Sequence, residues 1–300
     1  MKLGLGTAQF GLDYGISNPD GRTAEAEVRR ILEMAEKTKV TVLDTACLYG
    51  KSEEVLGRTL HAGHRFQIVT KTPKVSTHPI DKKVAGQFEE ALYHSLRLMQ
   101  QDRIYGLLAH DANDLLAEGG EWLFDAMIRL RDEGLINKLG ASVYTGQQID
   151  ALLDRYPIEL IQLPVSLLDQ RLIHSGHLQR LTVSGIEVHA RSVFLQGLIF
   201  LQPNLLPPHF AKTLPLLNEL HNELDLRGVT PEQAALHFII SLPGITTAVC
   251  GVNTVDQLAA LIDAVNADVQ SMKDFPWQRF SIEDTAIVNP AMWPSMQNLH

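Results

Sequence analysis

The sequence predicts an α/β protein that folds as a single (β/α)8 barrel, a prediction that rests on three observations. Short runs of apolar and β-branched residues alternate with longer stretches of helical periodicity, and the 300 residues hold eight of each. The short runs are apolar on both faces, which is typical of parallel strands covered by helices. No linker, repeat or low-complexity segment divides the chain, so we expect residues 1–300 to form one domain.

The expected strands are residues 2–6, 40–44, 66–71, 104–110, 137–142, 158–163, 186–191 and 246–251. Helices are expected between them. In residues 81–99, for example, Val84, Phe88 and Ala91 follow one another at spacings of four and three and form an apolar stripe. The full set of expected helices is residues 23–37, 52–61, 81–99, 120–132, 145–155, 170–184, 231–241 and 254–265.

Two further segments are too rich in proline or too weakly patterned to be core elements. Residues 201–212 follow the seventh strand, where they would overhang the active face of a barrel. The C-terminal tail, about residues 271–300, is expected to pack on or near the barrel. Its large apolar side chains either line a substrate pocket or only hold the tail in place; they are Trp277, Phe280, Met292 and Trp293.

Two nucleotide-binding motifs are incomplete. The Gly-Lys-Ser triplet of residues 50–52 suggests a phosphate-binding loop, but Thr45 stands where that motif requires its first glycine. A doubly wound open sheet would carry G-x-G-x-x-G after its first strand, whereas Gly4 and Gly6 are followed by Gln9. The sequence therefore disfavours a phosphate-binding loop at residues 45–52, and it also disfavours the open sheet, which is the alternative to the barrel.

Composition excludes several classes of partner. The formal net charge of -9 and the pI near 5.7 disfavour binding to nucleic acid or to anionic membranes. The two cysteines, Cys47 and Cys250, are too few for a disulfide scaffold and fit a reducing compartment. The N-terminus lacks the apolar core of a signal peptide, and residues 192–201 are too short to span a bilayer. We expect a soluble cytoplasmic protein, monomeric or weakly homo-oligomeric.

Residues 42–57, VLDTACLYGKSEEVLG, predict the end of a strand, a loop and the start of a helix. The strand ends at Asp44, and Tyr49 lies in the loop. Ser52, followed by two glutamates, is expected to be the N-cap of the helix.

Polar side chains also end the next two strands, at Lys71 and His110. In a barrel such ends meet at one face, where catalytic groups converge. Each residue alone has an ordinary structural explanation, as a cap, a solvated strand end, a packing residue or a loop hydrogen-bonder. Together with Asp44 and Tyr49 they suggest one chemistry, the protonation of an oxygen as a hydride reaches the adjacent carbon. In it, Lys71 lowers the pKa of the Tyr49 phenol, Asp44 keeps Lys71 charged, and His110 holds the carbonyl oxygen.

The chain resembles the aldo-keto reductases over nearly its whole length. The matching segments are GLGTAQFG, LDTACLYGKSEEVLG, IVTK, LLAHD, LINKLGASVYT, IQLPVSLLD, SVFLQGLI and AVCGVNTVDQLAALI. The resemblance implies an eight-stranded barrel that reduces aldehydes or ketones, a class that includes sugars and sugar-derived carbonyls, with a nicotinamide cofactor. It places the catalytic tetrad of that family on Asp44, Tyr49, Lys71 and His110.

The resemblance also implies cofactor contacts. Ser142 and Gln162 would bind the carboxamide of the nicotinamide, near Asp44, and Gly6, Thr7 and Ala8 would lie near its ribose. The loop after the seventh strand would surround the pyrophosphate, and the eighth strand and its helix would hold the adenosine. The residues concerned are Ser192, Leu195 and Gly197, and then Gly251 and Gln257.

Three departures from the family pattern concern the cofactor. Val143 replaces the usual Asn after the carboxamide-binding Ser, and Arg191 replaces an aromatic residue that often stacks on the nicotinamide. Residues 244–261 contain no Lys or Arg, although members that require a 2'-phosphate commonly have basic residues there. NADP(H) is expected from the resemblance, and NAD(H) stays open.

Two other functions stay open beside carbonyl reduction. A barrel of this kind could bind the cofactor without catalysis, as a redox sensor or partner-binding protein. It could also be an aldolase with Lys71 as the Schiff base, which leaves Asp44 and Tyr49 unexplained. The His61/His64 and His174/His177 pairs have a spacing seen in metal sites but no evident third ligand, so we expect metal-free catalysis. The substrate cannot be read from the sequence.

Overall fold

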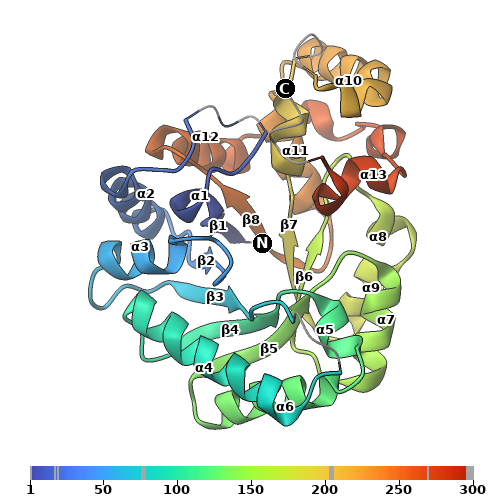
Figure 1. Ribbon diagram of the computed structural model, residues 1–300. Helices are drawn as coiled ribbons and strands as arrows, with labels where there is room; N and C mark the ends of the chain where they lie inside the picture. Colours follow the sequence, from blue (N-terminus) through green and yellow to red (C-terminus); the bar gives the residue numbers. More distant parts are fainter. Residues whose placement is uncertain are drawn as a thin grey trace.

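The computed structural model describes residues 2–16, 18, 20–75, 79–202, 206–268 and 270–294. Eight parallel strands form a closed barrel in which each strand pairs with the next and β8 pairs with β1, as expected. Figure 1 shows the strands at the centre of the molecule with the helices outside them. The strands are β1 (Lys2–Gly6), β2 (Val42–Asp44), β3 (Gln67–Lys71), β4 (Ile104–Ala109), β5 (Ile136–Ser142), β6 (Leu160–Pro164), β7 (Glu187–Arg191) and β8 (Ile245–Gly251).

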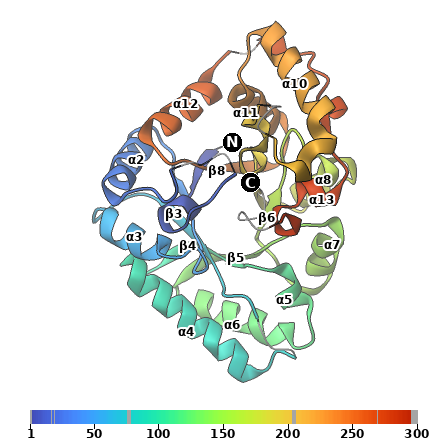
Figure 2. The same cartoon turned by 45° about the horizontal axis from the view of Figure 1, so that its top comes forward.

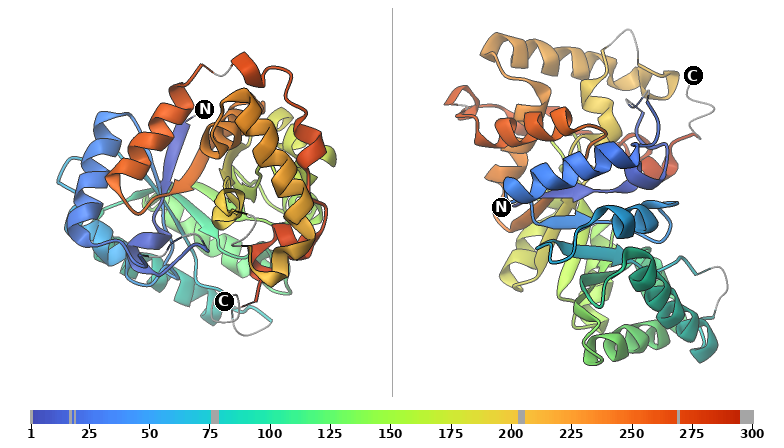
Figure 3. Two further views of the ribbon diagram at one scale, coloured as in Figure 1. Left: turned by 90° about the horizontal axis from the view of Figure 1, so that it is seen from above. Right: turned by 90° about the vertical axis from the view of Figure 1, so that its left-hand side faces the viewer.

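The connecting helices form a ring around the barrel (Figures 2 and 3). The main ones are α2 (Glu25–Lys37), α3 (Ser52–Thr59), α4 (Lys82–Met99), α6 (Gly120–Asp132), α7 (Gly146–Arg155), α8 (Arg171–His174), α9 (His177–Val183), α10 (Leu214–Arg227), α11 (Pro231–Ser241) and α12 (Val255–Asn266). Short α-helices are α1 (Ala8–Gly11), α5 (Ala112–Leu116) and α13 (Thr285–Val288). None of the helices in the described part of the chain is long and apolar enough to cross a membrane.

An apolar layer fills part of the barrel interior. Val42, Val69, Leu108 and Leu160 come from four different strands and pack together as a buried cluster. Side chains two residues further along a strand lie on the same face, one layer nearer the carboxyl ends. That next layer is polar, and consists of Asp44, Lys71, His110 and Gln162. The apolar cluster is therefore the floor beneath the polar residues that end these strands.

The observed secondary structure differs from the predicted one in several places. Residues 170–184 form two helices, α8 and α9, because Gly176 takes a left-handed conformation (φ 79°) between them. Helix α10 was not predicted, although Leu217, Leu220 and Leu224 form a buried stripe on it. Ser52 is the first residue of α3 rather than its N-cap; Lys51 takes that position without a side-chain bond.

The C-terminal tail packs on the barrel as far as the structure describes it. Phe280 is fully buried, and the Trp277 ring lies 4.5 Å from that of Phe275. The Trp293 ring meets Phe210 edge-on at 4.8 Å, and its indole N–H donates to the carbonyl of Ile287. These aromatic side chains fix the tail, and Met292 is largely exposed.

Candidate active site

Three polar residues meet in the barrel through one carboxylate oxygen. Lys71 Nζ and Gln162 Nε2 both donate to Asp44 Oδ1 at 2.7 Å, from strands on different sides of the interior. Lys71 Nζ also donates to the carbonyl oxygen of Thr45 at 2.9 Å. All three side chains are almost completely buried. Burying an ammonium and a carboxylate is unfavourable unless they are paired and hydrogen-bonded, and this geometry meets both conditions.

Tyr49 and His110 lie beside this ion pair. Lys71 Nζ is 5.0 Å from the centroid of the Tyr49 ring, and the Tyr49 and His110 rings are 6.0 Å apart, edge to face. His110 Nδ1 is buried and has no hydrogen-bond partner among the described residues. The structure therefore brings together the four residues that were predicted from strand ends far apart in the sequence.

The backbone around Tyr49 depends on two glycines. A Cβ on Gly11 would lie 1.8 Å from the carbonyl oxygen of Tyr49, so only glycine lets α1 pack against this loop. Gly50 has a φ of 57°, a left-handed conformation that glycine adopts without steric cost. These contacts fix where the loop presents the tyrosine.

Hydroxyl groups fix the end of β2. The backbone N–H and the Oγ1 of Thr7 both donate to the carbonyl of Asp44, at 2.9 and 3.0 Å. Ser52 Oγ is 2.8 Å from the Thr7 carbonyl oxygen and 3.1 Å from Thr45 Oγ1. Ser52 thus joins β1, β2 and α3 from inside the protein, which explains why it is buried instead of capping the helix.

The shift in the pKa of Tyr49 is opposite to the one expected from the sequence. Burial and the Asp44 carboxylate raise the pKa of the Tyr49 phenol above its ordinary value, whereas Lys71 was expected to lower it. The Lys71 ammonium does not outweigh these two effects, because Asp44, 2.7 Å away, offsets part of its charge. Burial lowers the pKa of Lys71, and Asp44 opposes that change. Burial and the charges of Lys71 and Lys74 lower the pKa of His110 to about 4, so the imidazole is neutral at pH 7.

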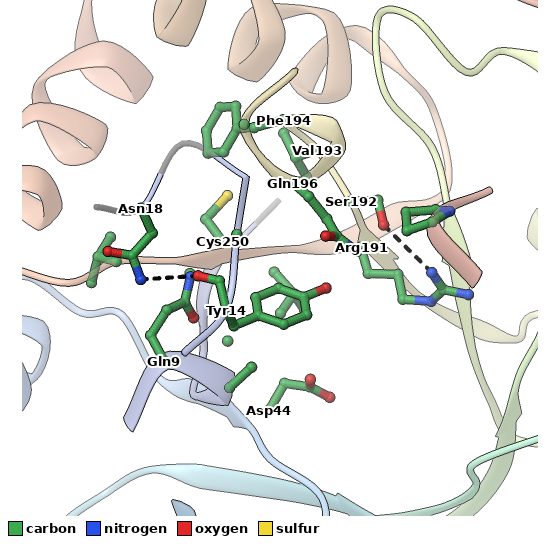
Figure 4. A pocket seen from close by; sticks show the side chains of 18 of the residues that line it. Gln9, Tyr14, Asn18, Asp44, Arg191, Ser192, Val193, Phe194, Gln196 and Cys250 are labelled. Carbon is green, nitrogen blue, oxygen red and sulfur yellow. Dashed lines mark hydrogen bonds between the residues drawn. The ribbon is translucent and has the colours of Figure 1, made fainter. Parts of the chain in front are cut away.

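A cavity of about 590 Å³ opens over these residues, within the usual range for sites that enclose a small molecule or cofactor. Figure 4 shows part of its lining, with Asp44 at the base. The predicted site residues that line it are Gly6, Ala8, Asp44, Tyr49, Lys71, His110, Ser142, Gln162, Arg191, Ser192, Gly197, Gly251 and Gln257. Thr7 and Leu195 are fully buried behind it and do not line it.

Several lining residues were not predicted. Tyr14 and Tyr144 add two phenols, and Pro290 and Ala291 bring the tail to the cavity without its aromatic side chains. Tyr144 lies two residues after Ser142, which was predicted to contact the cofactor, so its place near the site could have been inferred. Tyr14 lies in a loop without periodicity, and no sequence signal identified it. Other unpredicted lining residues include Gln9, Asn18, Asp20, Phe194, Gln196, Phe200, Glu232, Cys250 and Asn253.

The loop after β7 has an unusual backbone. Ser192, Leu195 and Gln196 have positive φ values of 58°, 46° and 52°, which cost energy for residues with a Cβ. The carbonyl of Gln196 accepts a hydrogen bond from Ile16 N at 3.1 Å, so this loop is tied to the one after β1. Such strain is concentrated at functional loops in proteins.

The end of the cavity beside β8 is polar but not basic. Thr254 caps α12, and Gln257 Oε1 accepts from the backbone N–H of Asn253 at 2.7 Å. Glu232 is also part of the lining. Lys71 and Arg191 are the basic residues among the described lining residues, and neither lies on β8 or α12.

Neither histidine pair belongs to a metal cluster. His61 pairs with Glu36, and His174 and His177 pair with Glu283 and Asp150. The described residues contain no group of three or more His, Cys, Asp or Glu that could hold a metal ion.

Comparisons with known proteins agree with this architecture. A model of the aldo/keto reductase family matches residues 2–276. Aldo-keto reductase YhdN of Bacillus subtilis (strain 168) is 26% identical over 288 residues, which cover 87% of this chain and 83% of that protein. The uncharacterized oxidoreductase YqkF of the same strain is 25% identical over 287 residues, 89% of this chain and 91% of that protein.

Solved structures share the fold. The aldo-keto reductase AKR11C1 from Bacillus halodurans, in its holo form, is similar with a TM-score of 0.73 and 23% identity, covering 93% of this chain and 90% of that chain. The glycerol dehydrogenase AKR11B4 from Gluconobacter oxydans is similar with a TM-score of 0.72 and 20% identity, covering 96% of this chain and 92% of that chain. At such identities the likeness supports the barrel architecture alone.

Proposed function

Since the chain belongs to the aldo/keto reductase family, we propose that this oxidoreductase reduces an aldehyde or ketone to an alcohol with a nicotinamide cofactor. The observation that carries the proposal is the polar layer above the apolar floor. There, the Asp44–Lys71 ion pair lies beside Tyr49 and His110 at one end of a cavity. The family match makes the cofactor-dependent reaction the natural use of this layer.

The volume of the cavity and the polar groups in its lining support the binding of a nicotinamide cofactor. Ser142 and Gln162 lie side by side in the register of β5 and β6 and both line the cavity, where they would hold the carboxamide. The strained loop at Ser192–Gly197 and the start of α12 would hold the phosphates and the adenosine. A reduced nicotinamide held there would supply a hydride to the carbonyl carbon of the substrate.

Tyr49 then supplies the proton. Because burial raises its pKa, the phenol is protonated at neutral pH and can donate to the carbonyl oxygen as the C–O double bond becomes a single bond. The hydride and this proton together complete the alcohol. The ring of the phenolate that remains lies close to the Lys71 ammonium, whose attraction offsets part of the cost that burial and the Asp44 carboxylate add to the charged form.

Lys71 and His110 support this transfer in different ways. Asp44 keeps Lys71 charged and fixes its position, so the ammonium is available when the phenolate forms. His110 is neutral and can donate one N–H to the same carbonyl oxygen, which holds the oxygen in line with Tyr49. The free Nδ1 suits a tautomer with its proton on Nε2, because an unprotonated nitrogen needs no acceptor.

A substrate screen tests the proposal. Aldehydes, ketones and sugars are offered with NADPH and with NADH, and the loss of nicotinamide absorbance is followed. We expect reduction of at least one carbonyl class. If both cofactors bind, as measured by quenching of protein fluorescence, but no carbonyl is reduced, the protein is a cofactor-binding barrel and the catalytic proposal is wrong.

A further inference from the structure

We propose that the carbonyl substrate carries a carboxylate, which Arg191 binds at the reacting end of the cavity. This inference rests on the proposed carbonyl reduction and adds the class of substrate. It depends on three features of Arg191: its unused donors, its fixed position and its place beside the reacting groups.

The Arg191 guanidinium has no anionic partner among the described residues. It donates to the Val143 carbonyl at 3.0 Å and, more weakly, to Ser192 Oγ at 3.4 Å. A guanidinium has five N–H donors, so most of its capacity remains unused. The cavity's other basic group, Lys71, is already neutralised by Asp44. Arg191 is thus the uncompensated cation of the described lining.

Contacts with the protein hold this guanidinium in a fixed plane. Its central carbon lies 4.2 Å from the centroid of the Tyr144 ring, a stacking geometry that favours arginine over lysine. The hydrogen bond from Arg191 Nη2 to the carbonyl oxygen of Val143 restrains the guanidinium further. Figure 4 shows the Tyr14 hydroxyl directed toward the Arg191 side chain. A fixed guanidinium with a phenol beside it is suited to a carboxylate, which accepts two parallel hydrogen bonds from arginine.

Arg191 ends β7 and lines the same cavity as Tyr49 and His110. Its charge contributes to lowering the pKa of His110 and opposes the rise in the pKa of Tyr49. In Figure 4 it lies on the opposite side of the cavity from Cys250 of β8. An anion bound here would be close to the carbonyl that Tyr49 protonates, and distant from the adenosine end.

The charge count favours a carboxylate over a phosphate. One free guanidinium balances a single negative charge, whereas a phosphate monoester carries nearly two and normally recruits several cations. Two parallel hydrogen bonds from Arg191 to the carboxylate would fix the orientation of the substrate, so that its carbonyl approaches Tyr49 from one direction. Arg191 is therefore a specificity-determining residue in this proposal.

The first experiment compares 4-carboxybenzaldehyde with its methyl ester, which has the same ring and aldehyde but no charge. We expect kcat/KM to be about tenfold to a hundredfold higher for the acid, mainly through a lower KM, as a charge-assisted bond would give. Arg191→Gln should remove this ratio and Arg191→Lys should restore part of it. Arg103→Gln, which removes an exposed cation, is the matched control and should keep the ratio. Equal ratios in wild type and Arg191→Gln would overturn the proposal.

A second experiment needs no turnover. Binding of 4-methylbenzoate, 4-methylbenzamide and phenyl phosphate to the wild type and to Arg191→Gln is measured by calorimetry, together with binding of both nicotinamide cofactors. Selective loss of benzoate binding supports the carboxylate site even if no aldehyde is reduced, in which case only the proposed function fails. Tighter binding of phenyl phosphate than of benzoate, or loss of cofactor affinity in place of benzoate affinity, would overturn the inference.

Discussion

Lys71 Nζ lies 2.7 Å from Asp44 Oδ1, and the two side chains are only 1% and 5% exposed. The pair lies at the carboxyl ends of β2 and β3, directly above the apolar cluster of the barrel interior. A single charge buried there would destabilise the folded protein, so the stability of the fold depends on both residues being present, as does the proposed chemistry.

We therefore predict that Asp44→Asn destabilises the protein by about 3 to 5 kcal/mol, because the Lys71 ammonium loses its counter-ion in a buried site. The double variant Asp44→Asn/Lys71→Met should recover most of the loss without recovering activity. Urea unfolding measures the stability of both variants, and the carbonyl-reduction assay measures their activity. The exposed pair Arg129–Glu89 provides the control, since Glu89→Gln should cost less than about 1 kcal/mol. Equal effects at the two carboxylates would contradict this view of the pair.

Tyr49→Phe tests the proposed general acid. We expect the rate of carbonyl reduction to fall by about 10² to 10⁴, as for the loss of a positioned proton donor, while cofactor affinity stays near that of the wild type. Steady-state kinetics and a fluorescence titration give the two quantities. Tyr93→Phe removes an exposed phenol and should leave both unchanged. Turnover of Tyr49→Phe within a few-fold of wild type would show that another group supplies the proton.

The lowered pKa of His110 predicts that the stability of the folded protein depends on pH. Its pKa in the folded protein is lowered to about 4, below the ordinary 6.5, so the unfolded chain takes up a proton first as the pH falls. Stability from this residue is complete above pH 6.5 and is lost between about 6.5 and 4, by at most about 3 kcal/mol. Urea unfolding of wild type and His110→Asn at pH 7.5 and 4.5 measures it. The substitution should reduce the loss at low pH, whereas His94→Asn, on the exposed side of α4, should not.

The sequence predicted the barrel because each strand and helix has its own local signal. All eight strands were found within a few residues, and their polar ends indicated which side chains meet. Features that depend on contacts across the barrel were not predictable in this way. The shared oxygen of Asp44 joins residues 118 positions apart, Asp44 and Gln162, and no local pattern indicates that bond.

The rise in the pKa of Tyr49 was missed for a related reason. The spacing of residues identified Lys71 as a neighbour of the phenol, but not that Asp44 would offset its charge and that burial would dominate. Ser52 was misassigned because a serine before two glutamates is typical of an N-cap, whereas here the hydroxyl turns inward to Thr7. Tertiary contacts overrode local preference at both positions.

The preference for NADH or NADPH gives the last prediction. The family resemblance favours NADPH, but the cavity wall at β8 and α12 offers Gln257 and Asn253 and no basic side chain, and Glu232 adds a negative charge to the lining. A charge-assisted bond to the 2'-phosphate is worth roughly 1.5 to 3 kcal/mol, so its absence should cost one to two powers of ten in affinity. We expect at most a modest preference for NADPH.

Gln257→Arg should strengthen NADPH binding selectively, because it adds a cation in the first turn of α12, where the helix N-terminus already favours anions. Ala260→Arg, on the same helix and also in the cavity lining, tests whether the position matters or only the added charge. Fluorescence titration with both cofactors measures each variant. A wild-type preference for NADPH of about a thousandfold or more would mean that a basic residue elsewhere reaches the phosphate. The first candidates are Lys212 and Arg191, and if it is Arg191, the carboxylate site proposed for that residue would also be wrong. In either case the adenosine would lie away from Gln257, and the placement of the cofactor along the cavity would have to be revised.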